Sequence, residues 1–163
     1  MIIDQQVNQL ADLALAKHAQ LVTAESCTGG GIAQAITELA GSSRWFDRGF
    51  VTYSNNAKQT MLGVPPATLL QWGAVSEQTA LAMAQGALTH SQGTMSVAVT
   101  GIAGPGGGST EKPVGTVWVG WCQRGETATA QLFHFSGDRN SVRQQTIQAA
   151  LQGCIDRLSK VVD

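Results

Sequence analysis

The chain has 163 residues, which is the length of one domain with a substantial core. Apolar residues make up 43% and charged residues 13%, a composition that excludes disorder and indicates a compact fold. A net charge of −1 without a Lys/Arg run argues against nucleic-acid binding, and no apolar stretch is long enough to span a membrane. Cys27, Cys122 and Cys154 fit neither a disulfide framework nor a zinc site. Without a secretory signal pattern, we expect a cytoplasmic protein.

The apolar pattern predicts alternating helices and strands in the first two thirds of the chain. An amphipathic helix comes first, with Asp4 as its cap and Val7, Leu10, Ala11 and Ala14 at helical spacing. The expected elements that follow are a buried strand at 21–24, a helix at 31–39, a strand at 49–53, a short helix at 55–62, a helix capped by Ser76 and an apolar strand at 95–100. The pair Pro65-Pro66 breaks the pattern and predicts the start of a connector.

The last third of the chain predicts a long loop, a hairpin and a helix. The loop at 101–113 is rich in glycine, and strands at 115–122 and 127–135 flank Arg124-Gly125 as in a β-hairpin. A C-terminal helix follows, with Asp138 as its cap. Its expected buried stripe consists of Ile147, Leu151, Cys154, Ile155 and Leu158. Because helices alternate with strands before a hairpin, we expect a single three-layer α/β domain over residues 1–163 with a mixed sheet.

A serine stands at the junction between the first strand and the second helix, in the run Thr23-Ala24-Glu25-Ser26-Cys27-Thr28-Gly29-Gly30. Small residues and glycines leave the Ser26 hydroxyl exposed near free backbone N–H groups, which is the geometry of a serine nucleophile. The N–H groups of Thr28, Gly29 and Gly30 are candidates to hold an oxyanion. The alternative is that Ser26 caps the next helix and the glycines form a simple turn.

A serine nucleophile needs a base. His18 and His90 lie near the ends of predicted helices and His134 lies in a strand, so none of the three is well placed. Lys58, in Tyr53-Ser54-Asn55-Asn56-Ala57-Lys58, is the better candidate because its apolar neighbours favour burial. Burial lowers a lysine pKa from ~10.4 toward the ~7–8 that a base requires at neutral pH. The alternative is a solvent-exposed lysine on a short helix.

Three neighbouring residues leave alternatives open. Cys27 is the stronger nucleophile if its pKa is depressed, but no histidine is placed to activate it, and a packed thiol is the favoured interpretation. Ser54 lies one helical turn before Lys58, a position that favours a helix N-cap. Glu25 points away from Ser26 if it lies on the strand, and either bonds backbone N–H groups or orients a substrate group.

Two further segments contain candidates for ligand binding. The run Thr100-Gly101-Ile102-Ala103-Gly104-Pro105-Gly106-Gly107-Gly108 follows a strand, so it lies at the carboxyl end of the sheet, where α/β proteins bind ligands. It matches neither a Walker loop nor a dinucleotide fingerprint, and a flexible surface loop is the alternative. Arg139 and Arg143 share one face at the start of the last helix, either as a phosphate clamp or as a solvated pair. The candidates for substrate contact here are Thr100, Gly101, Gly104 and Arg143.

Together these segments resemble the CinA C-terminal domain family, whose stand-alone members are nicotinamide-nucleotide amidases. The resemblance covers nearly the whole chain. Besides the run around Ser26, it rests on Gly49-Phe50-Val51-Thr52-Tyr53-Ser54-Asn55, Gly73-Ala74-Val75-Ser76, Gly101-Ile102-Ala103-Gly104-Pro105, Lys112-Pro113-Val114-Gly115-Thr116-Val117 and Gly137-Asp138-Arg139. It implies an α/β/α sandwich with a mostly parallel sheet, a homo-oligomer, and no cofactor or metal. The implied reaction converts nicotinamide mononucleotide to nicotinic acid mononucleotide and ammonia in pyridine-nucleotide recycling.

The resemblance also implies a serine–lysine mechanism, carried over here to Ser26 and Lys58, with Tyr53 as an accessory hydroxyl. Backbone N–H groups around 28–30 then hold the oxyanion, and the glycine-rich loop and Arg143 hold the ribose phosphate. Two other functions compete with this one. A catalytically silent nucleotide-binding module is disfavoured by the intact serine and lysine. An interaction protein linked to DNA uptake or damage responses gains no support from the near-neutral charge.

Overall fold

The middle layer of the protein is a five-stranded sheet with strand order β2-β1-β3-β4-β5. A computed structural model describes residues 2–160. The strands are β1 (Leu21–Glu25), β2 (Phe46–Val51), β3 (Met95–Gly101), β4 (Thr116–Gln123) and β5 (Thr129–His134). Strand β1 pairs in parallel with β2 and β3, whereas β4 is antiparallel to β3 and β5. Four of the five strands therefore run in one direction, which confirms the expected mixed, mostly parallel sheet.

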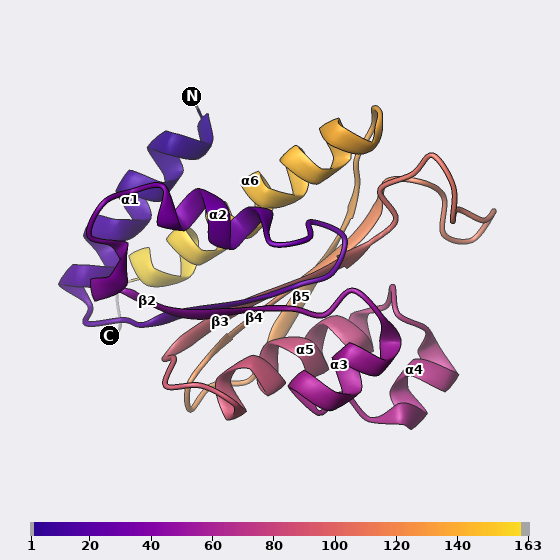
Figure 1. Cartoon of the computed structure of the whole chain (residues 1–163), viewed down its shortest axis with the longest axis horizontal. Coiled ribbons are helices and arrows are strands. Elements are labelled where there is room, and N and C mark those ends of the chain that lie inside the picture. The colour runs from indigo at the N-terminus through magenta and orange to yellow at the C-terminus, as the bar shows by residue number, and fades with distance from the viewer. Residues whose placement is uncertain (1, 161–163) are drawn as a thin grey trace.

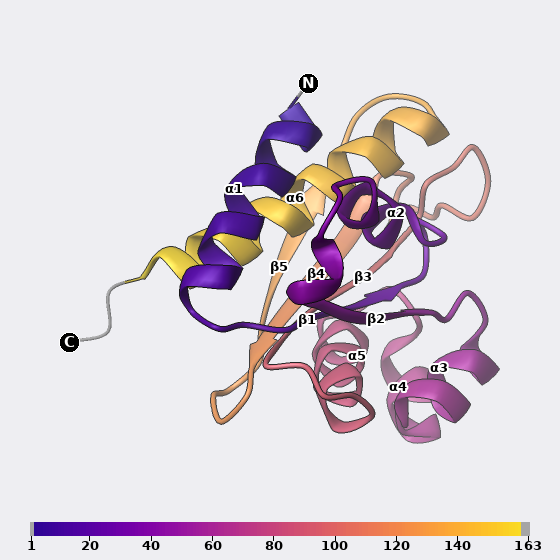
Figure 2. The ribbon, with the colours of Figure 1, turned by 60° about the vertical axis from the view of Figure 1, so that its left-hand side comes forward.

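Helices cover both faces of this sheet, as Figures 1 and 2 show. One face carries α1 (Ile2–Ala16), α2 (Gly31–Thr37) and α6 (Arg139–Ser159), and the other carries α3 (Asn55–Leu62), α4 (Pro66–Trp72) and α5 (Glu77–Thr89). A short 3-10 helix, Ser42–Arg44, precedes β2. Each face has its own apolar core, around Leu10, Ile36 and Leu151 on one side and around Val22 and Met83 on the other. The fold is an α/β/α sandwich.

The order of elements matches the sequence-based expectation with one exception. Residues that follow Pro65 were expected to form a connector, but they form helix α4. Proline is well tolerated in the first turn of a helix, where its missing N–H has no partner to lose, so Pro66 begins a helix here. Strand β2 also starts earlier than expected, because Phe46 pairs with Leu21, and it ends at Val51. Tyr53 therefore lies beyond the strand.

The carboxyl ends of the central parallel strands meet at one edge of the sheet. Backbone hydrogen bonds continue past the ends of the strands there: Ser26 N–H donates to Val99 O at 3.1 Å, and Thr52 N–H donates to Glu25 O at 2.8 Å. The residues that follow β1 and β2 are thereby held side by side. The candidate catalytic residues Ser26 and Lys58 follow these two strands, so the candidate site lies at this edge.

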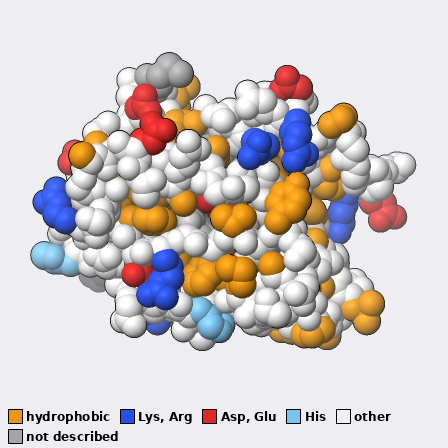
Figure 3. All heavy atoms as spheres, viewed as in Figure 1, with side chains coloured by type: hydrophobic (Ala, Val, Ile, Leu, Met, Phe, Trp, Pro, Cys, Tyr) orange, Lys and Arg blue, Asp and Glu red, His pale blue; other side chains and the backbone are white. Residues whose placement is uncertain are grey.

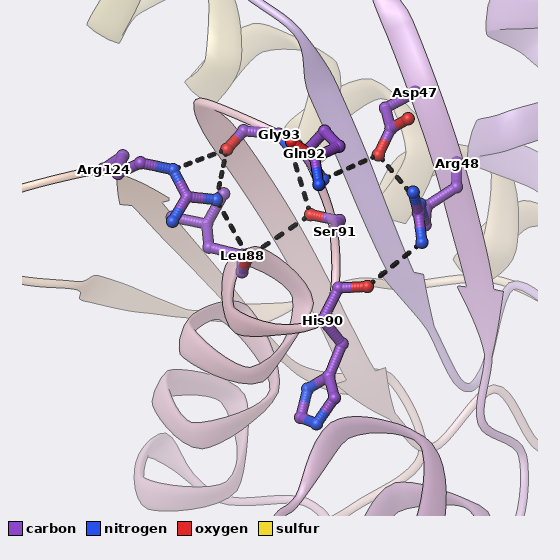
Figure 4. A network of polar contacts seen from close by, with 8 residues as sticks. All are labelled: Asp47, Arg48, Leu88, His90, Ser91, Gln92, Gly93 and Arg124. Carbon is purple, nitrogen blue, oxygen red and sulfur yellow. Dashed lines mark hydrogen bonds and ion pairs between the residues drawn. The ribbon is translucent and has the colours of Figure 1, made fainter.

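A network of polar contacts closes the opposite edge of the sheet (Figure 4). The Arg124 guanidinium donates to Leu88 O at 2.9 Å and to Gly93 O at 2.9 and 2.6 Å, and Asp47 accepts from the backbone N–H of Gln92 at 3.1 Å. These contacts join the start of β2 and the end of β4 to the turn between α5 and β3. The network is structural, because Arg124 and Arg48 donate to backbone carbonyls of this turn, at Leu88, Gly93 and His90.

The surface carries few charges. On the face drawn in Figure 3, basic and acidic side chains stand singly or in pairs among apolar and uncharged groups. No helix among residues 2–160 combines the length and apolar character that crossing a bilayer requires.

Candidate active site

A cleft of about 280 Å³ opens at the carboxyl ends of β1 and β3. Its walls come from the turn after β1, the start of α3, the segment before α5, the loop after β3 and the first turn of α6. The residues that the sequence selected for catalysis or substrate contact and that line the cleft are Ser26, Tyr53, Lys58, Thr100, Gly101 and Gly104, and Cys27 and Arg139 line it as well. The topology therefore gathers side chains from three distant parts of the chain.

Lys58 and Ser26 contact each other inside this cleft. The Lys58 Nζ lies 3.2 Å from Ser26 Oγ and donates to Thr52 O at 3.1 Å. The Lys58 side chain is 1% exposed and Ser26 is 8% exposed. Helix α3 delivers the lysine, and its N-cap is Ser54, whose hydroxyl accepts from Ala57 N–H at 3.0 Å. The expected capping role of Ser54 is confirmed, and the alternative of an exposed Lys58 is wrong.

Burial lowers the pKa of Lys58 below its ordinary value of 10.5, and only the neighbouring Cys27 thiol acts in the opposite direction. The one ion pair among residues 2–160 joins Arg48 to Asp47, so no carboxylate holds the Lys58 ammonium. When the amine is neutral, Nζ has a lone pair and the Ser26 hydroxyl donates to it. The site thus favours the form of lysine that accepts a proton.

Glu25 is fully buried on β1 and turns toward helix α2. Its carboxylate accepts from the Thr28 hydroxyl, from Ile32 N–H at 2.8 Å and from Ala33 N–H at 3.0 Å. Of the two roles left open by the sequence, the structure supports the bonding of backbone N–H groups. The carboxylate is stabilised by the unpaired N–H groups at the start of α2 instead of by a basic side chain.

The other candidate nucleophile and bases are unsuited to the reaction. Burial raises the pKa of the Cys27 thiol to about 12, so it stays protonated at neutral pH. The histidines His18, His90 and His134 are exposed, and none lines the cleft. Ser26 and Lys58 are left as the candidate nucleophile and base of this site.

Arg139, which the sequence analysis named as half of a possible phosphate clamp but did not choose for substrate contact, bridges the mouth of the cleft. Arg139 Nη1 donates to Gly104 O at 2.9 Å, and its Nη2 donates to the Tyr53 hydroxyl at 3.1 Å. Tyr53 itself is 61% exposed. Both acceptors are neutral, and no carboxylate among residues 2–160 forms an ion pair with this guanidinium. The sequence signal for Arg139 was its place directly after the cap Asp138, at the end of α6 nearest the sheet edge.

The loop after β3 forms the opposite wall. The Thr100 hydroxyl donates to Ala74 O at 2.7 Å, which ties β3 to the segment before α5. A Cβ atom at Gly101 would lie 2.6 Å from the Val117 side chain, so only glycine fits at this strand end. Gly104 adopts a positive φ of 85°, which an L side chain rarely does. At the far end of the loop, Lys112 Nζ donates to Trp72 O at 3.1 Å.

The remaining candidates lie behind the cleft and do not line it. Arg143 and Thr28 border a second groove of about 740 Å³ between α1, α2 and α6, and Arg143 Nη2 donates to Thr28 O at 2.9 Å. Arg139 and Arg143 share a helix face, but a rise of ~1.5 Å per residue sets them about 6 Å apart along the axis. The structure therefore brings Arg139 to the cleft and leaves Arg143 outside it.

The backbone of the turn after β1 offers N–H groups unequally. The Gly29 N–H donates to Ser26 O at 3.0 Å and is engaged. The N–H groups of Cys27, Thr28 and Gly30 make no hydrogen bond within the described part of the chain. Among residues 2–160, no three His, Cys, Asp or Glu side chains are grouped to hold a metal ion. The cleft is thus lined by a hydroxyl, a buried amine, a thiol and one guanidinium, beside a turn with free backbone N–H groups.

Comparison with known proteins identifies the family of the chain. Residues 3–158 match the family described as the CinA C-terminal domain. The chain is 53% identical over 153 residues to the nicotinamide-nucleotide amidohydrolase PncC of Escherichia coli K12, covering 93% of this chain and 90% of that protein. It is 53% identical over 138 residues to PncC of Pseudomonas putida, covering 85% and 86% of the two chains. The crystal structure of the competence/damage inducible protein CihA from Agrobacterium tumefaciens superposes with a TM-score of 0.94 at 46% identity, over 98% of this chain and 97% of that one. The chain belongs to the CinA C-terminal domain family.

Proposed function

We propose that this protein is a nicotinamide-nucleotide amidohydrolase that converts nicotinamide mononucleotide to nicotinic acid mononucleotide and ammonia, with Ser26 as nucleophile and Lys58 as base. The relatives at 53% identity carry this activity in their names and align over nearly their full length. The observation that carries the mechanism is the 3.2 Å contact between Lys58 Nζ and Ser26 Oγ at a buried site.

In the first half of the reaction, Ser26 Oγ attacks the carboxamide carbon while the neutral Lys58 amine takes the hydroxyl proton. The carbonyl oxygen of the substrate becomes an oxyanion, and we assign the free backbone N–H groups of Cys27 and Thr28 to receive it. One such donor contributes roughly 3 kcal/mol to the transition state. The Lys58 ammonium then gives its proton to the departing nitrogen, which leaves as ammonia and creates an ester on Ser26.

In the second half, water attacks the ester carbon. Lys58, again neutral, takes a proton from the water and returns it to Ser26 Oγ as the ester bond breaks. The products are a carboxylic acid and the regenerated Ser26 hydroxyl, and the acid then loses its proton to solvent or to the released ammonia to become the carboxylate. A general base contributes ~10²–10⁴-fold to such a step.

Arg139 is the group we assign to the ribose phosphate. The resemblance to the family had implied Arg143 for this contact, but Arg139 is the arginine that lines the cleft. Its partners Tyr53 and Gly104 are neutral hydrogen-bond acceptors, so a phosphate that replaces either one adds an ion pair to the hydrogen bond. The homo-oligomeric state, the cytoplasmic location and the part in pyridine-nucleotide recycling stay predictions.

The test is release of ammonia from nicotinamide mononucleotide by the purified protein. We expect turnover by the wild type and its loss in Ser26→Ala and in Lys58→Ala, each checked for folding by circular dichroism. Thermal stabilisation by the nucleotide without turnover in the wild type would support a silent binding module instead. Turnover that persists in both folded variants would exclude the proposed pair of catalytic residues.

A further inference from the structure

The turn that carries Ser26 is held from behind by groups that do not line the cleft. The peptide between Thr28 and Gly29 is fixed on both sides. Its carbonyl accepts from Arg143 Nη2 at 2.9 Å and from Gly31 N–H at 3.0 Å, and its N–H donates to Ser26 O at 3.0 Å. Because the peptide is planar and rigid, a hydrogen bond that fixes its carbonyl also fixes the N–H that donates to the backbone of Ser26.

The side chain of Thr28 is fixed as firmly as its backbone. It is 1% exposed, and its hydroxyl donates to the fully buried carboxylate of Glu25. The same carboxylate holds the first N–H groups of α2, at Ile32 and Ala33. Strand β1, helix α2 and helix α6 thus meet at one threonine next to the nucleophile.

Burying these polar groups costs free energy of folding. Glu25 is buried with no ion-pair partner among residues 2–160, and Arg143 Nε is buried without a hydrogen-bond acceptor there. Burying a charge or an unpaired donor costs free energy, and apolar side chains of similar volume are often the more stable choice at such a place. The rest of this core consists mainly of such apolar side chains. Charged groups at this one turn point to a need for fixed geometry.

We propose that Arg143, Thr28 and Glu25 are positioning residues for Ser26. Acting through the Thr28–Gly29 peptide, they hold Ser26 Oγ against Lys58 and keep the N–H groups of Cys27 and Thr28 free to receive the oxyanion. The inference rests on the proposed hydrolysis at Ser26. It gives Arg143 a role in the rate of the chemical step, where a phosphate clamp would give it a role in substrate binding.

The two roles predict different kinetics. Loss of positioning lowers kcat and leaves KM unchanged, because a displaced nucleophile reacts slowly with a substrate that still binds; displacements of this kind cost up to ~10²-fold. Loss of a substrate contact raises KM. The pH midpoint of kcat/KM stays the same in a positioning variant, since neither Glu25 nor Arg143 is among the groups that shift the pKa of Lys58.

The experiment compares two conservative and two disruptive variants. Thr28→Val removes the hydroxyl and keeps the shape, whereas Thr28→Ser keeps the hydroxyl. Arg143→Met removes the donor, whereas Arg143→Lys keeps one. The matched control is Arg157→Met on the same helix, because Arg157 stacks 4.0 Å above the Trp121 ring and bonds Thr129, away from the turn. Steady-state kinetics with nicotinamide mononucleotide and hydrogen–deuterium exchange of the peptide covering 26–31 are measured for each.

We expect kcat to fall roughly 10- to 100-fold in Thr28→Val and Arg143→Met, with KM and the pH midpoint unchanged and faster exchange at 26–31. Thr28→Ser should recover most of the rate, Arg143→Lys part of it, and Arg157→Met should show wild-type kcat. A rise in KM at constant kcat in Arg143→Met, or unchanged kcat and exchange in both disruptive variants, overturns the proposal. If the wild type releases no ammonia, the proposed function fails, and the exchange measurement still decides whether these residues hold the turn.

Discussion

Glu25 and Lys58 are both buried at the carboxyl edge of the sheet, yet they do not pair. Glu25 accepts from the Thr28 hydroxyl and the first N–H groups of α2, whereas Lys58 contacts Ser26 Oγ and Thr52 O. A carboxylate beside Lys58 would favour its ammonium form and raise its pKa. The negative charge of Glu25 is held at the start of α2 instead, so burial lowers the pKa of Lys58 and only the neighbouring Cys27 opposes it.

The first prediction is that Lys58→Met stabilises the protein while abolishing activity. The folded protein has a lowered pKa for Lys58, so the unfolded chain binds more protons between that lowered value and 10.5. The free energy of unfolding of the wild type therefore rises with pH through this window. At pH values below the window the buried ammonium lowers the free energy of unfolding by its full amount, and above pH 10.5 it no longer lowers it. Urea unfolding at several pH values should show Lys58→Met gaining most at low pH, and a gain independent of pH would contradict the assignment to Lys58.

The second prediction concerns the pH dependence of the reaction. Because Lys58 works as a neutral amine, kcat/KM should rise with pH through a midpoint below the ordinary lysine value of 10.5. Ammonia release at limiting nicotinamide mononucleotide measures this profile. A flat profile between pH 6 and 9 would count against a lysine base, and thermal melts at each pH separate titration of the site from unfolding.

The third prediction is that the cysteine beside the nucleophile is dispensable for chemistry. The pKa of Cys27 is raised to about 12 by burial, so its reactive thiolate form is scarce at neutral pH. Cys27→Ala should therefore keep kcat within a few-fold of wild type, and iodoacetamide at pH 7 should leave the wild-type enzyme active. Loss of activity in a folded Cys27→Ala protein, with a normal Ser26→Ala protein, would reverse the roles of the two residues.

The fourth prediction separates the two arginines at the start of α6. Arg139→Gln should raise KM for nicotinamide mononucleotide roughly 10- to 100-fold, since a hydrogen bond to a charged group contributes ~1.5–3 kcal/mol. Nicotinamide riboside, which lacks the phosphate, supplies the matched control, and its kcat/KM should hardly change in the same variant. Equal losses with both substrates would mean that Arg139 acts on the chemical step or on the fold of the loop at Gly104.

Local patterns explain why so much of this site could be predicted from the sequence. Ser26 follows a short apolar strand and precedes glycines, and Lys58 follows a helix cap by one turn, so each was recognisable within a few residues. Helical phase gave the shared face of Arg139 and Arg143, but it does not say how far each lies from the sheet edge. The partners of Glu25 depend on how α2 turns back over β1, which is a tertiary property. The prediction of a connector after Pro65-Pro66 was wrong because proline, which ends a preceding helix, is also favoured in the first turn of the next one.

The last prediction tests the wall of the cleft opposite Ser26. Gly101→Ala places a methyl group 2.6 Å from the Val117 side chain and 3.0 Å from Thr116 O, where backbone pairing between β3 and β4 leaves little room to move. Overpacking of this kind costs about 1–3 kcal/mol, so the melting temperature should fall. Gly106→Ala, in the loop that follows β3, is the control, because a Cβ there meets nothing within 4 Å. Calorimetry should show a clearly lower melting temperature for Gly101→Ala and little change for Gly106→Ala. Equal melting temperatures would mean that the end of β3 shifts to accommodate the methyl group, contrary to the rigidity that its packing indicates.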